Sequence, residues 1–104
     1  MASQAAASKG ASSGSSSTPE VYLLLAQAYY ERNDLPASEK AFSKAAALRD
    51  DCKTWFNLGV VRLRLSDYTG AQAAFKVAAQ HPEVREQANR ELDNIREATR
   101  LGTR

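Results

Sequence analysis

The sequence repeats itself at an interval of 33 residues, and this interval restricts the folds that the chain can adopt. The interval matches large residues with large ones and small with small. The matched pairs are Tyr22 with Trp55, Leu25 with Leu58, Ala26 with Gly59, Asp34 with Asp67, Leu35 with Tyr68, Phe42 with Phe75, Ala45 with Ala78 and Ala46 with Ala79. Large side chains that pack against small ones let helices approach closely. The interval therefore predicts a helical unit that stacks on a copy of itself.

Five amphipathic segments separated by helix-breaking residues follow the Ser-rich beginning of the chain. We expect helices at about 19–32, from 35 to the Asp50-Asp51 pair, at 52–65, at 68–80 and at 83–101. The first begins with a capping hydroxyl and a proline, Thr18 and Pro19. No segment alternates apolar and polar residues as a strand does, and no Asn-Gly or Asp-Gly turn is present. The sequence therefore predicts an all-α fold in which short connections make neighbouring helices antiparallel.

The second unit carries aromatic, small and proline residues at a fixed spacing. They are Trp55, Leu58, Gly59, Ala71, Phe75 and Pro82. This spacing resembles the tetratricopeptide repeat (TPR), whose pattern is Trp-x2-Leu-Gly-x2-Tyr, Ala-x3-Phe and Pro. The first unit keeps the size classes with Tyr22, Leu25, Ala26, Tyr29, Ser38 and Phe42, but has Arg49 in place of Pro. The resemblance implies a short right-handed superhelix of stacked antiparallel hairpins.

The resemblance also divides the chain. A TPR-like domain is expected at 19–101, with repeat 1 at about 19–51, repeat 2 at about 52–82 and a capping helix at about 83–101. The capping helix places Val84, Ala88, Leu92, Ile95 and Thr99 on one stripe, which would shield the last repeat. Residues 102–104 form the C-terminal end.

A concave groove lined by the first helix of each repeat is the binding site that the resemblance implies. By position, its residues are Leu23, Gln27, Tyr30 and Glu31 from repeat 1, Phe56, Val60, Leu63 and Arg64 from repeat 2, and Asn89, Asp93 and Arg96 from the last helix. We expect the chain to act as an adaptor, scaffold or chaperone-like module whose groove takes a peptide or a partner helix. Leu23, Tyr30, Phe56, Val60 and Leu63 would then form an exposed apolar strip.

A second interpretation of the apolar strip stays open. The capping helix or a second copy of the chain would cover it, and the protein would be a structural self-association or complex-assembly subunit, for example a homodimer.

Some TPR proteins grip the carboxylates at the C-terminus of a peptide, and only two residues here match their positions. These are Asn57 and Arg90, whereas Leu23, Gln27 and Glu86 occupy the other three positions. The positive charges that such a grip needs are therefore missing. The candidates for binding a peptide or partner are Leu23, Gln27, Tyr30, Phe56, Asn57, Val60, Leu63, Arg64 and Arg90.

Composition argues against several functional classes. With 14 Lys and Arg against 12 Asp and Glu, the net charge is only +2, which gives no electrostatic case for binding nucleic acid. No apolar run is long enough to span a bilayer, so we expect a soluble, cytoplasmic protein without membrane insertion. Cys52 and His81 are the only residues of their types, which argues against a disulfide framework, a Cys/His zinc site and a nucleophile–histidine pair. We expect no catalytic residue, cofactor or metal ion.

Two features depart from an ordinary TPR domain. Residues 1–18 are rich in Ser, Ala and Gly and lack a large apolar side chain other than Met1, which predicts a disordered linker or leader; a targeting or phosphorylated segment is the alternative. Arg62 stands where the family has a packed aromatic residue. A guanidinium there should reach the surface or meet an acid, and Glu91 is the acid that we expect.

Overall fold

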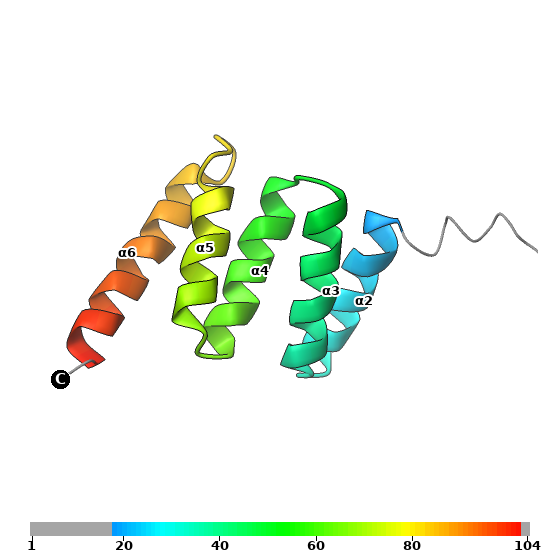
Figure 1. The fold of residues 1–104 in the computed structure, drawn as a ribbon, viewed down its shortest axis with the longest axis horizontal. Coiled ribbons are helices and arrows are strands. Elements are labelled where there is room, and N and C mark those ends of the chain that lie inside the picture. Colours follow the sequence, from blue (N-terminus) through cyan, green and yellow to red (C-terminus); the bar gives the residue numbers. More distant parts are fainter. Residues whose placement is uncertain (1–17, 103–104) are drawn as a thin grey trace, which may run out of the picture.

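Five α-helices make up the part of the chain that the computed structural model describes, residues 18–102 (Figure 1). They are α2 (Pro19–Glu31), α3 (Leu35–Leu48), α4 (Cys52–Arg64), α5 (Tyr68–Ala78) and α6 (Arg85–Gly102). No strand is present in this range, which confirms the all-α expectation. The helix α6 begins two residues later than expected, because a turn precedes it in which the Val84 amide donates to the carbonyl of His81. The expected disordered tail, Thr18 apart, lies outside the described residues.

Side-chain caps begin four of the helices. The Thr18 hydroxyl accepts a hydrogen bond from the amide of Val21. Carboxylates of Asp34, Asp51 and Asp67 cap α3, α4 and α5 in the same way. These contacts satisfy amides that have no partner within the helix. In the first turn of α2, a backbone hydrogen bond and the neighbouring Arg49 hold the pKa of Glu20 below its usual range.

The two turns inside the hairpins repeat each other. Asn33 and Ser66 have left-handed backbones, with φ of 63° and 62°. The amide after each donates a 2.8 Å hydrogen bond back into the preceding helix, from Asp34 to Tyr29 and from Asp67 to Arg62. The same turn conformation therefore recurs in the structure at the 33-residue interval seen in the sequence.

The helices pack in chain order: α2 on α3, α3 on α4, α4 on α5 and α5 on α6 (Figure 1). Two hairpins, α2–α3 and α4–α5, therefore lie side by side, and α6 covers the far side of the second. The core has two parts. One lies between the hairpins and consists of Ala26, Ala41, Phe42, Leu58, Val61 and Ala74. The other lies between the second hairpin and α6 and consists of Ala71, Phe75, Ala78, Ala88 and Ile95.

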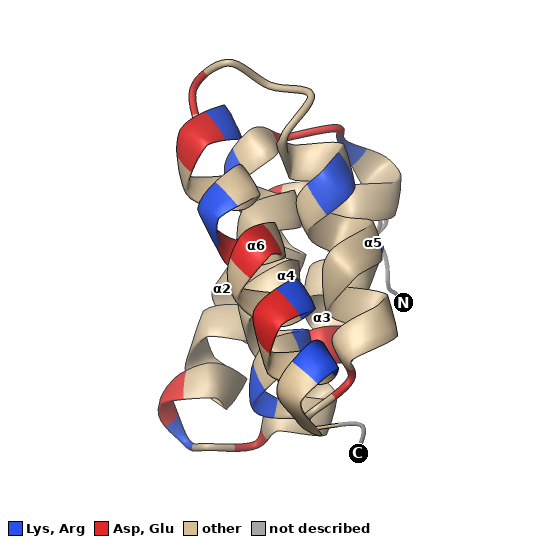
Figure 2. Cartoon of the chain, turned by 90° about the vertical axis from the view of Figure 1, so that its left-hand side faces the viewer, with Lys and Arg blue, Asp and Glu red and all other residues tan. Residues whose placement is uncertain are grey.

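Along α6, basic and acidic residues alternate on the side away from the core (Figure 2). The apolar stripe expected for this helix faces inward: Ala88 and Ile95 are buried, and Val84, Leu92 and Thr99 are half-buried. A helix with one charged and one apolar face is suited to close the end of a helical stack.

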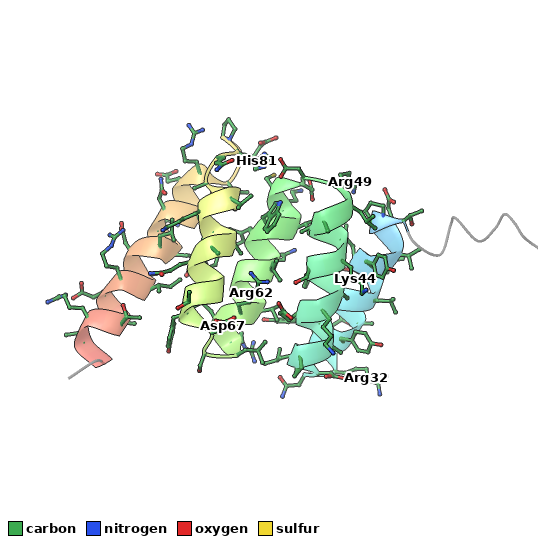
Figure 3. The ribbon with its side chains drawn as sticks, in the orientation of Figure 1. Arg32, Lys44, Arg49, Arg62, Asp67 and His81 are labelled. Atoms are coloured by element: carbon green, nitrogen blue, oxygen red, sulfur yellow. The ribbon has the colours of Figure 1, made fainter. Side chains whose placement is uncertain are left out.

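Arg62 meets an acid, but not the expected one (Figure 3). Its guanidinium lies 3.0 Å from the Glu39 carboxylate and donates to the carbonyl of Gly70 and, at 3.4 Å, to the hydroxyl of Ser43. The expectation of Glu91 is wrong because Arg62 points toward α3 and the start of α5, whereas Glu91 belongs to α6, which packs on α5.

Candidate functional site

A hollow of about 420 Å³ lies between α2 and α4. Gln27, Tyr30 and Glu31 line it from α2, Asn57, Val60 and Val61 from α4, and Phe42 from α3. Phe42 and Val61 are buried, so they form an apolar floor. The amides of Gln27 and Asn57 and the carboxylate of Glu31 add polar groups to the same hollow. A surface of this composition can contact an apolar side chain and hydrogen-bond a peptide group.

Four of the candidate binding residues are brought together in this hollow. They are Gln27, Tyr30, Asn57 and Val60, and the groove residue Glu31 joins them. The resemblance to TPR proteins implied groove positions for Gln27, Tyr30, Glu31 and Val60, and a carboxylate-grip position for Asn57. Phe42 and Val61 were not among the candidates, because their apolar character and spacing indicate only burial.

Arg64 connects the two helices at one end of the hollow. Its guanidinium donates a 3.0 Å hydrogen bond to the Tyr30 hydroxyl and lies 5.4 Å from the centre of the Tyr30 ring. Stacking and hydrogen bonding together restrict the ring. Arg64 therefore positions Tyr30, a lining residue, relative to α4.

The expectation of a continuous exposed apolar strip is wrong. Leu23 and Tyr30 are half-buried against the core between the hairpins. The three strip residues of α4, Phe56, Val60 and Leu63, are half-buried against the core that α6 shares. The Phe56 ring, for example, packs edge to face on Phe75, with ring centres 5.2 Å apart. The apolar stripe of α6 buries itself on α5, and these α4 residues pack against the core cluster that α5 and α6 form.

The candidates on the last helix lie apart from the hollow. Arg90, Asn89, Asp93 and Arg96 are exposed on α6, and Arg96 pairs with Asp93 at 2.8 Å. None of them lines the hollow that contains Asn57. Of the two residues that match a carboxylate grip, Asn57 lines the hollow and Arg90 does not.

Reactive side chains are few in residues 18–102. The His81 imidazole lies 3.1 Å from the Asp50 carboxylate, where the turn before α6 meets the loop before α4. Cys52 is buried and carries a free thiol. The described residues contain no group of three or more His, Cys, Asp and Glu arranged to hold a metal ion. Within the same residues, no helix combines the length and the apolar character needed to cross a bilayer.

Comparisons with known proteins identify no relative. No family model matches the sequence, and neither a curated protein nor a solved structure matches the chain. The function must therefore be inferred from the surface itself.

Proposed function

We propose that the chain is a non-catalytic protein–protein interaction module that binds an extended segment of a partner protein in the hollow between α2 and α4. The single observation that carries the proposal is that Gln27 and Asn57, one from each repeat, flank one apolar floor. The resemblance of the sequence to TPR proteins supports the same role, because the first helices of such repeats line the peptide groove.

The chemistry of the hollow suits a peptide. A side-chain amide both donates and accepts, so Gln27 and Asn57 can pair with the N–H and C=O groups of a bound main chain. Phe42, Val60 and Val61 can receive one apolar side chain of the peptide. The volume falls within the range of about 300–1,000 Å³ that is usual for small-ligand sites. We expect specificity to come from that side chain and affinity to come mainly from the amide contacts.

The alternative, a complex-assembly subunit, has an observation of its own. Because Phe56, Val60 and Leu63 pack against the core that α5 and α6 share, the second repeat has little free apolar surface on that side. In this alternative the two repeats serve mainly as a rigid support, and contacts to other subunits lie elsewhere on the molecule.

Peptide selection followed by a matched pair of variants tests the proposal. Peptides would be selected from a random display library on the full chain, and their dissociation constants measured for wild type, Asn57→Ala and Asn94→Ala. We expect Asn57→Ala to weaken binding about tenfold, or about 1.4 kcal/mol, because the bound main chain loses its amide partner.

Asn94 is the control, since it is an exposed amide on α6 that does not line the hollow. Its replacement should leave the affinity unchanged. Equal affinity of the selected peptides for Asn57→Ala and wild type would contradict the proposal, as would failure of the full chain to enrich any peptide.

A further inference from the structure

A second hollow lies on the opposite side of the first hairpin, facing away from α4. It measures about 220 Å³ and is lined by Tyr22, Leu25, Tyr29, Ala37, Lys40, Ala41 and Lys44. We call these residues the end face. Leu25 is 42% exposed there, and its neighbour Leu24 on α2 is 68% exposed. The repeat pattern in the sequence predicts only a packing role for Tyr22 and Leu25.

The internal repeat shows what such a surface receives. Leu58 occupies in the second hairpin the position that Leu25 has in the first, yet it is only 1% exposed. It is buried because the first hairpin packs on it through α3, and Phe42 lies in the same core. The end face is therefore the counterpart of a surface that elsewhere in the molecule is covered by a helix. Its shape suits an α-helix laid against α2 and α3.

Charge distinguishes the end face from its counterpart. At the positions of Ala73 and Val77 in the second hairpin, the first hairpin has Lys40 and Lys44. Neither lysine forms an ion pair within residues 18–102, and no acid lines this hollow. The Lys44 amine lies 6.0 Å from the centre of the Tyr22 ring, so it borders the apolar part (Figure 3). An apolar surface bordered only by lysines is complementary to an apolar stripe flanked by carboxylates.

The contact between the hairpins contains the same kind of pairing. There, Glu39 on the covering helix α3 meets Arg62 on the covered helix α4. An acid beside the apolar stripe of a covering helix thus already stabilises one helix contact in this molecule.

A second copy of the chain fits the end face poorly. A two-fold contact would bring Lys40 and Lys44 of one copy against the same lysines of the other, with no acid lining either hollow. The outer side of α6 carries charges of both signs (Figure 2). Within the described part of α6, Leu101 is the only strongly exposed large hydrophobic residue. The outer side of α6 therefore offers no apolar stripe to the end face of a neighbouring copy.

We propose that the end face binds an amphipathic α-helix of a partner protein, with an apolar stripe flanked by Glu or Asp. The stripe packs on Tyr22, Leu25 and Tyr29, and the flanking carboxylates pair with Lys40 and Lys44. This site is separate from the hollow between α2 and α4 and does not depend on peptide binding there.

Two synthetic helical peptides test the proposal. Both carry the same Leu and Ala stripe at three- and four-residue spacing; one has Glu on its flanks and the other Lys. Binding to the full chain would be followed by NMR. We expect the Glu-flanked peptide to shift the resonances of Tyr22, Leu25 and Tyr29 and to bind at least tenfold more tightly than the Lys-flanked peptide.

Charge reversal supplies the matched variants. The double variant Lys40→Glu, Lys44→Glu should reverse the preference between the two peptides. The control Lys53→Glu, Lys76→Glu changes the net charge equally at exposed positions of α4 and α5 and should keep the wild-type preference. All four lysines are exposed, so the fold should tolerate both changes.

Three results would overturn the proposal. One is the absence of shifts at the end face with either peptide. Another is a preference that the Lys40→Glu, Lys44→Glu variant leaves unchanged. The third is a concentration-dependent shift of the Tyr22, Leu25 and Tyr29 resonances without peptide, which would assign the face to a second copy of the chain.

Discussion

At the scale of single residues, Arg62 connects three helices through one guanidinium. It pairs with Glu39 of α3 and donates to the carbonyl of Gly70 in α5, while belonging itself to α4. The pair is mostly shielded, with side-chain exposures of 21% for Arg62 and 25% for Glu39.

Removing the Arg62 guanidinium should therefore destabilise the fold. We expect Arg62→Leu to lower the free energy of unfolding by about 2 kcal/mol, because Glu39 keeps a partly desolvated charge without a partner. Adding Glu39→Leu should recover about 1 kcal/mol or more relative to the sum of the single changes. Urea denaturation measures both. The exposed pair Arg96–Asp93 supplies the control, since Arg96→Leu should cost less than about 0.5 kcal/mol. If the effects of Arg62→Leu and Glu39→Leu on the free energy of unfolding simply add, the two residues do not stabilise the fold as a pair.

Gly59 of α4 lies directly against the Phe75 ring of α5. A Cβ atom there would lie 2.7–2.9 Å from the ring of Phe75, which is fully buried. We expect Gly59→Ala to destabilise the protein by about 1 kcal/mol, since overpacking of about 1–3 kcal/mol outweighs the gain of up to about 1 kcal/mol in helix propensity. Thermal or urea unfolding checks this. Gly102→Ala has open space around it and should change stability little. A Gly59→Ala variant as stable as wild type would show that Phe75 can move aside.

At the scale of elements, the positions of the helices could be predicted from the sequence, but the sides through which the helices contact one another could not. Thr18, Pro19 and the capping aspartates are local features, so the starts of the first four helices followed from the sequence. The partner of Arg62 and the cover over Phe56 depend on which side of α4 meets α3 or α6, which spacing alone does not determine. The resemblance to TPR proteins made Gln27 and Asn57 candidates for binding, but the free end face could be recognised only from the packing of the helices.

The two hairpins should respond differently to the same change. We expect Leu58→Ala to cost about 3 kcal/mol, because it leaves a cavity between the hairpins. Leu25→Ala, at the matching position, should lower the free energy of unfolding by about 1 kcal/mol or less. Leu25 is 42% exposed, so its removal takes away little buried apolar surface. Urea denaturation of both variants at one protein concentration makes the comparison. Equal losses would mean that something covers the end face in solution, against the further inference.

At the scale of the whole molecule, the stack has two unlike ends and one hollow between its first helices. The helix α6 closes one end with a charged outer side, whereas α2 and α3 leave an apolar surface bordered by lysines at the other. The hollow between α2 and α4 lies on neither end. The proposed site for an extended segment and the proposed site for a helix therefore lie at separate places on the molecule.

The most direct test of peptide binding is an NMR map of the complex with a peptide selected on the full chain. We expect the largest shifts on the side-chain amides of Gln27 and Asn57 and on Tyr30 and Val60, with intermolecular contacts between the peptide and the Val60 methyl groups. Shifts that leave Gln27 and Asn57 unchanged and gather on α5, α6 or the end face would contradict it.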